Sequence, residues 1–190
     1  RWTPATGEPI TPKAQAFTNG VQLVMPEGSY AIGACPREGW SIQSAQCEPG
    51  VIRTLAKRDL QPGETVDLTL GLGWHFPYWT SSDGETLRHR YAVSYADAGA
   101  VLAAVLPRAD EIEKRVIAWQ ETIYASTAPA LLKDAVINSL YVLPRNSWWM
   151  ADGRFFQSES FTGCPITETF VCRYYGSFPL ALMFPECERA

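Results

Sequence analysis

A stretch in the last third of the chain interleaves aromatic residues with carboxylates and other polar side chains. It runs over 146–163 and contains Trp148, Trp149 and Glu159. A pyranose ring presents apolar C–H faces that stack on flat aromatic rings, and hydroxyl groups that bind carboxylates. Cleavage of a glycosidic bond needs two carboxyl groups, one on each side of the bond. The residue types in this stretch, which we expect to be a loop, therefore suit the chemistry of sugars.

Other common chemistries lack their motifs in this sequence. It contains no nucleophile elbow, phosphate-binding loop, dinucleotide fingerprint or zinc-protease helix. The five cysteines show no C-x-x-C spacing, and only two histidines accompany them. We expect free, mostly buried thiols and no metal site. The thiols leave the compartment open and favour a reducing one, such as the cytoplasm. The cysteines are Cys35, Cys47, Cys164, Cys172 and Cys187.

The composition is that of a globular chain without a surface suited to nucleic acid. Of its 190 residues, 46% are hydrophobic and 19% are charged. The formal net charge is −4 at pH 7, and no basic run interrupts this mild acidity. The longest nearly apolar run, 174–184, is far shorter than the roughly 18 residues that a membrane-spanning helix needs. The sequence predicts a buried core, no nucleic-acid partner and no transmembrane segment.

The sequence pattern of the elements that would position these candidate sugar-binding residues changes near residue 98. Before this point, short runs rich in β-branched residues are separated by turn residues, and they cover 21–25, 30–33, 51–55 and 66–70. The last run alternates apolar and polar residues, the period-two pattern of a strand with one wet face. We therefore predict that residues 1–97 belong to an antiparallel β-sandwich.

Helical spacing dominates after residue 98. Apolar side chains recur every three or four residues and predict a helix over about 110–125, with Asp110 as its N-cap. A second helix is predicted from about 129 until Pro144 stops it, and a third over about 169–184. The first two, joined by a short link, should form an antiparallel pair.

Several short motifs follow one another in a specific order from residue 138 onward. They are Asn138-Ser139-Leu140-Tyr141, Trp148, Asp152-Gly153, Glu159, the run from Tyr175 to Leu180, Phe184-Pro185-Glu186 and Glu188. This order resembles the start of the catalytic domain in glycoside hydrolase family 116, the family of bile acid β-glucosidase and non-lysosomal glucosylceramidase. Upstream, 60–64 and 73–77 look like the last strands of its N-terminal sandwich. The resemblance covers most of the chain from about residue 60.

This resemblance implies a fold and an activity. The family combines a β-sandwich with an (α/α)6 barrel, so the expected fold is mixed, with part of a sandwich over 1–97 and the first helices of a truncated barrel over 98–190. Only about three or four of the twelve barrel helices would fit, which implies a segment of a longer protein. The implied activity is the hydrolysis of β-glycosides with retention of configuration and without a cofactor. The substrate would be a small-molecule β-glycoside or a glycolipid.

The resemblance also implies roles for individual residues. Glu159 falls at the nucleophile position, where a carboxylate attacks the anomeric carbon and forms a glycosyl-enzyme ester. The family's acid/base is an Asp that would lie beyond Ala190, so we expect this chain to be inactive alone. Val171 stands where the family has an Asp that holds sugar hydroxyls, and Glu168 is the candidate replacement. The other candidate substrate-binding residues are Trp148, Trp149 and Arg173.

Less specific interpretations of the same residues remain open. Glu159 also fits an exposed acid at a helix entry, Glu168 fits a charge at a helix N-terminus, and the tryptophans fit a packed core. The alternative function is a catalytically silent carbohydrate-binding or architectural protein on the same fold. A further alternative is an inverting enzyme, whose carboxyl groups lie about 6.5 to 9.5 Å apart rather than about 5 to 5.5 Å.

Three polar residues outside this stretch are expected to have structural roles. Asn138, on an otherwise apolar helix, should be a buried amide bound to backbone groups. His75 should pack at the end of the sandwich. His89, which lies between two arginines, should be solvent-exposed.

Overall fold

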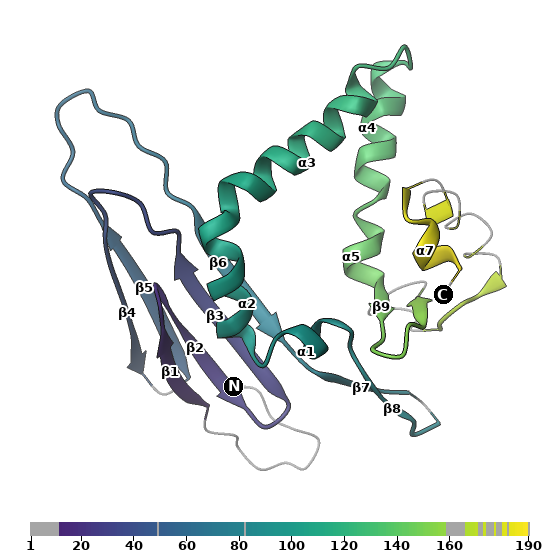
Figure 1. Cartoon of the computed structure of the whole chain (residues 1–190), viewed down its shortest axis with the longest axis horizontal. Coiled ribbons are helices and arrows are strands. Elements are labelled where there is room, and N and C mark those ends of the chain that lie inside the picture. Colours follow the sequence, from purple (N-terminus) through teal and green to yellow (C-terminus); the bar gives the residue numbers. More distant parts are fainter. Residues whose placement is uncertain are drawn as a thin grey trace. The chain divides into compact units, whose positions relative to one another are not determined.

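The structure, a computed structural model, describes residues 12–48, 50–81, 83–158, 166–170, 173, 177, 180–181 and 183–189. Figure 1 shows the order of its elements. The strands are β1 (Lys13–Phe17), β2 (Gly20–Met25), β3 (Gly28–Ala34), β4 (Ser41–Glu48), β5 (Val51–Lys57), β6 (Leu70–His75), β7 (Tyr78–Thr80), β8 (Thr86–Arg88), β9 (Ser147–Trp149) and β10 (Phe155–Gln157). The helical segments are α1 (Tyr91–Ser94), α2 (Ala98–Val105), the 3-10 turn η1 (Leu106–Arg108), α3 (Ala109–Tyr124), α4 (Ala130–Ser139), α5 (Val142–Asn146) and α7 (Pro185–Glu188).

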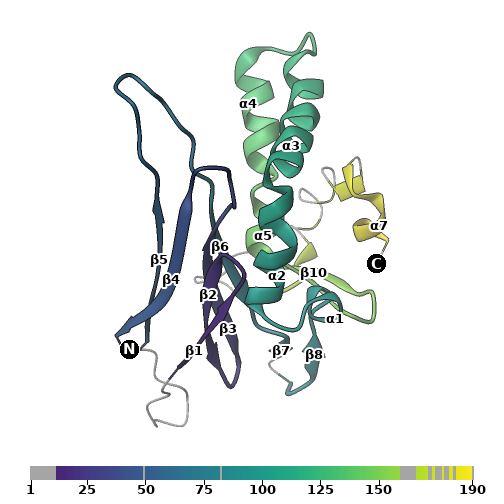
Figure 2. The same cartoon turned by 60° about the vertical axis from the view of Figure 1, so that its left-hand side comes forward.

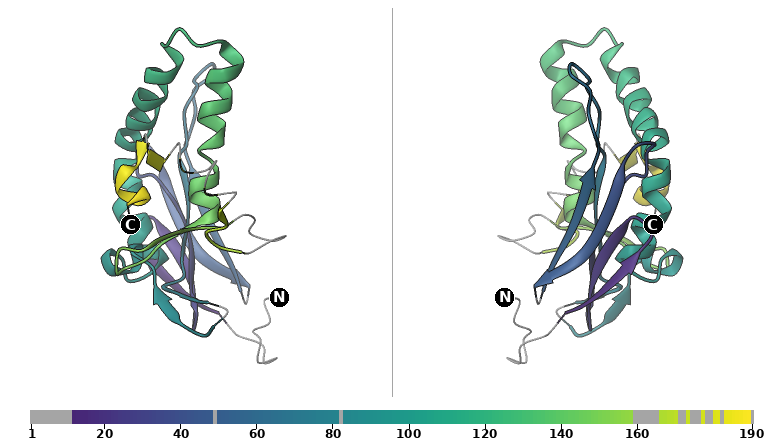
Figure 3. Two further views of the ribbon diagram at one scale, coloured as in Figure 1. Left: turned by 90° about the vertical axis from the view of Figure 1, so that its right-hand side faces the viewer. Right: turned by 90° about the vertical axis from the view of Figure 1, so that its left-hand side faces the viewer.

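The chain forms two compact units, one of residues 1–79 and 91–113, the other of residues 80–90 and 114–190. The first unit is built on an antiparallel sheet in the order β1-β2-β3-β6. β4 and β5 form a separate antiparallel hairpin that lies against β2 and β3 (Figure 3). The strands predicted over 21–25, 30–33 and 51–55 are confirmed, and so is an antiparallel sheet portion followed by helices.

The strand predicted over 66–70 is wrong for most of its length. Residues 64–69 are not in a strand, and β6 begins only at Leu70. A strand needs a neighbour that satisfies its N–H and C=O groups, which an alternating pattern cannot supply. Leu68 is 40% exposed, and Thr69 accepts the hydrogen bond from Cys35 N (2.9 Å) that leads into β6.

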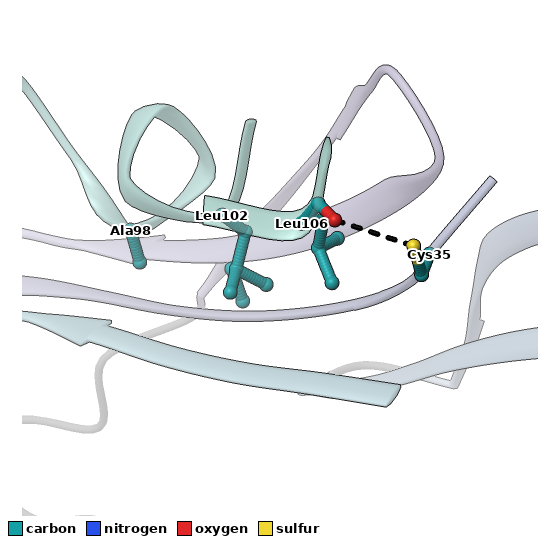
Figure 4. Packing of buried hydrophobic residues seen from close by; sticks show 5 residues of the cluster. Cys35, Ala98, Leu102 and Leu106 are labelled. Carbon is teal, nitrogen blue, oxygen red and sulfur yellow. Dashed lines mark hydrogen bonds between the residues drawn. The ribbon is translucent and has the colours of Figure 1, made fainter. Parts of the chain in front are cut away.

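Helix α2 covers one face of the four-stranded sheet (Figure 2). Ala98 and Leu102 of α2 and Leu106 of η1 point at the strands and pack with Ala31 and Cys35 into the buried core (Figure 4). The Cys35 thiol donates to the Leu106 carbonyl over 3.2 Å. This cluster fixes the helix to β3.

Glycines on β6 let α2 approach closely. A Cβ atom on Gly71 would lie 2.9 Å from a methyl of Leu106, and one on Gly73 would lie 3.0 Å from Leu102. Both distances are too short for ordinary carbon contacts. The strand therefore presents bare backbone to the helix and its large side chains to the other face.

Polar groups of the sheet satisfy the N-terminus of α2. The first backbone N–H groups of a helix have no intrahelical acceptor. Here Ala98 N donates to Ser29 Oγ (2.8 Å) and Gly99 N donates to Gln22 Oε1 (2.9 Å). These bonds explain why two polar strand residues, Ser29 and Gln22, are buried.

The helical chain continues from α2 through η1 into α3. The helix predicted over 110–125 is confirmed as α3. Asp110 is not its N-cap, because η1 precedes α3 without a break. Its carboxylate instead pairs with the Arg37 guanidinium, at 2.5 and 3.3 Å.

The second predicted helix starts where expected but ends early. α4 stops at Ser139, and Pro144 lies inside α5 instead of ending a helix. Pro144 is the third residue of α5, where a missing N–H removes no intrahelical bond. The predicted helical pair is joined by a short turn, across which Lys133 Nζ donates to Tyr124 O (2.7 Å). Asn138 does donate to a backbone carbonyl, that of Asp134 (2.8 Å), but its side chain is exposed and not buried.

The third predicted helix lies partly outside the described residues. Those described between 170 and 183 are helical, and Arg173 N donates to Thr169 O over 2.8 Å. In the described part of the chain, no helix combines the length and apolarity that crossing a bilayer requires.

Candidate functional site

The described part of the aromatic and acidic stretch, residues 146–158, contains an antiparallel hairpin where a loop is expected. In the second unit, β9 pairs with β10 so that Trp149 faces Phe155, Trp148 faces Phe156 and Ser147 faces Gln157. Gly153 in the connecting turn has φ of +102°, a conformation that side chains disfavour. A hairpin of two short strands, rich in aromatic residues, therefore carries the two candidate tryptophans.

The two tryptophans lie on opposite faces of this hairpin, because side chains alternate along a strand. Trp149 shares its face with Phe155 and Gln157, and Trp148 shares the other with Phe156. Trp149 is 37% exposed, and the Arg90 guanidinium lies 4.6 Å from its ring centre, in a cation–π contact. At most one of the two tryptophans can therefore face a given ligand.

The segment after β8 adds a third backbone run to the hairpin. Arg90 N donates to Trp149 O and Ala151 N donates to Arg88 O, each over 2.8 Å. Between them, His89 bridges to Met150, and the histidine is only 9% exposed. The expectation of a solvent-exposed His89 is therefore wrong, because the arginines on either side point outward while the histidine faces inward. His75 in the first unit is buried as expected, with Nε2 2.9 Å from Tyr95 O.

Ion pairs fix the turn of the hairpin. Arg154 Nη2 lies 2.8 Å from Asp152 and 3.0 Å from Glu85. Hydrogen bonding by Arg154 lowers the pKa of the Asp152 carboxyl, and the two carboxylates raise the pKa of the guanidinium. These charges are solvent-exposed and orient the turn.

Beyond β10, the main chain of Gln157 is bonded to Glu168. Glu168 N donates to Gln157 O (2.9 Å), and Gln157 N donates to Glu168 Oε1 (2.6 Å). Glu168 has φ of +55°, in the left-handed region. Next to this pair, Ser158 bridges to Thr167. The backbone is thus held together on both sides of the segment 159–165.

Arg173 joins three groups at this position. Its Nη1 donates to Gln157 Oε1 (3.2 Å), its Nε lies 3.3 Å from Glu168 Oε2, and its Nη2 lies 3.4 Å from Glu188 Oε2. Its side chain is 21% exposed. The Glu188 oxygen is buried and has only this ion pair, without hydrogen-bond geometry, among the described residues. We call Gln157, Glu168, Arg173 and Glu188 the polar cluster; its one cation faces two carboxylates.

Of the predicted site residues, Glu168 bonds to the main chain of Gln157 and Arg173 to its side chain. Trp149 lies on the same face of the hairpin as that side chain, and Trp148 is on the other face. Both oxygens of Glu168 have protein partners. Glu159 and Val171 lie outside the described residues, as do Cys164 and Cys172. Of the remaining cysteines, Cys35 and Cys187 are free and buried as expected, whereas Cys47 is free but exposed.

The sequence does not predict three residues of this region as site residues. Gln157 and Glu188 enter the polar cluster only because the chain folds back between them. Arg90 meets Trp149 only through the pairing of β9 with the segment after β8. No short-range spacing connects these residues, although Glu188 does belong to the motifs that resemble the family.

Ser158, directly before Glu159, is held in place. Its N–H donates to Asn146 O (2.8 Å), and the residue is 6% exposed. Among the described residues its hydroxyl has no hydrogen-bond partner.

The described residues contain no group of three or more His, Cys, Asp or Glu side chains placed to hold a metal ion.

No family model matches this chain, and no curated protein matches it.

Proposed function

We propose that the chain is part of a retaining β-glycoside hydrolase of the family 116 type, with Glu159 as its nucleophile. In this proposal, residues 1–97 are the end of a β-sandwich, and the helices from α2 onward are the first of an (α/α)6 barrel. The proposal is supported by the order of motifs from residue 138 and by the residues gathered at the end of β10.

The observation that carries the proposal is the set of side chains on the face of β10 that carries Gln157, two residues before Glu159 in the sequence. An aromatic face with Trp149 and Phe155 continues along β10 to Gln157 and the polar cluster. Flat apolar surface beside carboxylates and a guanidinium is the combination that a sugar ring and its hydroxyls require.

The proposed reaction has two steps. The ionised carboxylate of Glu159 attacks the anomeric carbon, the bond to the leaving oxygen breaks, and that oxygen takes a proton from the acid/base, an Asp expected downstream of Ala190. Water, deprotonated by the same Asp, then hydrolyses the ester. Glu168 and Arg173 are proposed to bind hydroxyls or to hold the groups that do, in place of the acid replaced by Val171.

A trapping experiment tests the nucleophile. A polypeptide extended past Ala190 is incubated with an activated 2-deoxy-2-fluoro-β-glucoside and digested for mass spectrometry. The expected result is one added fluoroglucosyl mass on the peptide that contains Glu159. Glu159→Gln should lower kcat/KM for an aryl β-glucoside by at least about a thousandfold, whereas Glu121→Gln, at an exposed acid of α3, should leave it unchanged.

The same experiment separates the alternatives. Full activity in Glu159→Gln, or a label on another peptide, would exclude Glu159 as nucleophile. Sugar binding without turnover or label in the parent protein would support the silent carbohydrate-binding alternative. If turnover occurs, the anomer first formed, followed by NMR, distinguishes retention from inversion.

A further inference from the structure

Strand β6 forms one edge of the four-stranded sheet and exposes large apolar side chains. Leu70, Leu72 and Trp74 are 64%, 66% and 59% exposed, on the face opposite α2. Tyr30, which faces Trp74 across the sheet, is 43% exposed and extends this surface. We call Leu70, Leu72 and Trp74 the β6 edge strip.

The edge of β6 also lacks the usual protection against pairing. Edge strands are commonly protected by charged residues or proline. β6 has neither between Leu70 and Trp74, whereas the opposite edge strand, β1, begins with Lys13 and contains Gln15. Among the described residues, no strand pairs with the outer side of β6.

The register of the sheet tells which backbone groups point outward. Cys35 N donates to Thr69 O, and the pairing with β3 continues with Gly33 opposite Gly71. In an antiparallel ladder, hydrogen-bonded and non-hydrogen-bonded residues alternate. The N–H and C=O groups of Gly71 and Gly73 therefore point to β3. Those of the β6 edge strip point away from the sheet and are available to another strand.

We propose that this edge pairs with the same edge of a second copy of the chain, antiparallel and two-fold symmetric about Leu72. The sequence Leu70-Gly71-Leu72-Gly73-Trp74 has the same order of large and small residues in both directions. With Leu72 opposite its symmetry mate, Leu70 of one protomer faces Trp74 of the other. The strip residues then form two hydrogen bonds at each pair, and every large side chain stays on one face.

The helix layer is compatible with this pairing. α2 contacts both β3 and β6, so its axis lies over the last two strands. With strands about 4.8 Å apart, the two copies of α2 would lie about 10 Å apart, close to the usual spacing of packed helices of about 8–10 Å. α2 contains only Ala, Gly, Val and Leu, so no charge opposes the approach.

The contact area is that of a modest dimer. The strip and Tyr30 expose on the order of 400 Å² of apolar surface per protomer. Two copies with their strand edges and helices would approach the roughly 1,000 Å² that a specific interface needs. We therefore expect a dissociation constant on the order of micromolar.

Sedimentation velocity of the full 190-residue chain between about 1 and 200 µM tests the dimer. The weight-average mass should rise with concentration toward twice the chain mass of 21.1 kDa and level off there. Leu72→Lys places two like charges opposite each other on the axis and should raise the dissociation constant at least tenfold. Leu131→Lys, at an 82% exposed leucine of α4, is the matched control and should still dimerise. Circular dichroism verifies that each variant is folded.

A pair of double variants tests the register. Leu70→Lys with Trp74→Glu places opposite charges across the interface and should retain a dimer, whereas Leu70→Lys with Trp74→Lys should not. A parent chain that is monomeric at every concentration would overturn the proposal. So would a dimer that survives Leu72→Lys, a loss of dimer in Leu131→Lys, or association that continues past the dimer.

Discussion

Glu168 and Gln157 are bonded twice, backbone N–H to carbonyl in one direction and backbone N–H to carboxylate in the other, at 2.9 and 2.6 Å. Glu168 makes these bonds from the left-handed region, which costs a residue with a side chain about 1 kcal/mol. The two hydrogen bonds and the ion pair with Arg173 offset this cost. Glu168 is therefore a strained residue that the polar cluster holds in place.

Substitutions of Glu168 should separate the strain from the hydrogen bond. Glu168→Ala keeps the strain and loses the acceptor for Gln157 N, and should destabilise the fold by about 1–2 kcal/mol. Glu168→Gly also relieves the strain and should be more stable than Glu168→Ala by up to about 1 kcal/mol. Urea unfolding measures the order. A glycine variant less stable than the alanine variant would show that the left-handed conformation does not hold in solution.

Adding a methyl group to β6 should displace α2. Gly71→Ala and Gly73→Ala place a Cβ about 3 Å from Leu106 and Leu102, and overpacking of this kind costs about 1–3 kcal/mol. Leu72→Ala, on the exposed face of the same strand, should change the free energy of unfolding by less than about 0.5 kcal/mol under monomeric conditions. Equal effects on the two faces in thermal or urea unfolding would contradict the packing of α2 on these glycines.

The Asp152–Arg154 pair should make stability depend on acid pH. Because the folded state lowers the pKa of Asp152, its stabilising effect is present above the unfolded pKa of about 3.9 and is lost as the pH falls through the lower folded value. The Tm difference between the parent and Asp152→Asn should be constant from about pH 5 to 7 and shrink below about pH 4. Asp59→Asn, at another exposed acid, serves as control. A difference that is the same at pH 2 and pH 7 would exclude this electrostatic origin.

If the proposed hydrolase activity holds, the two tryptophans should differ in their effect on substrate. Trp149, on the hairpin face that also carries Phe155 and Gln157, should contribute to stacking, so Trp149→Ala should raise KM for an aryl β-glucoside about two- to tenfold. Trp148→Ala removes the ring on the opposite face and should leave KM within about twofold of the parent. The reverse result would place the sugar on the Trp148 face.

Local patterns predicted the elements whose partners are near in sequence. The spacing of apolar residues predicts α3 because apolar side chains recur every three to four residues along one face of that helix. Runs of β-branched residues between turn residues predict β2, β3 and β5. The alternation at Val66, Leu68 and Leu70 misled, because pairing with β3 begins only at Leu70. Asp110 had the residue type of an N-cap, but the 3-10 turn before it removed that role.

The candidate site depended on contacts between distant residues, which no local pattern contains. Trp148 and Trp149 were found from their residue type, but their opposite faces follow from pairing with β10. Arg173 is a candidate from its place in the sequence, whereas its contact with Glu188 depends on the chain folding back. Glu159 and Val171 lie outside the described residues, so their roles stay predictions.

The buried thiol of Cys35 gives this protein a built-in reporter of its own opening. Because its sulfur is covered by the last turn that fixes α2 to the sheet, a thiol reagent reaches it only when that helix lifts. The rate at which Cys35 is labelled, with the exposed Cys47 as an internal reference for unhindered reaction, would therefore measure how often this part of the first unit opens, without an engineered cysteine.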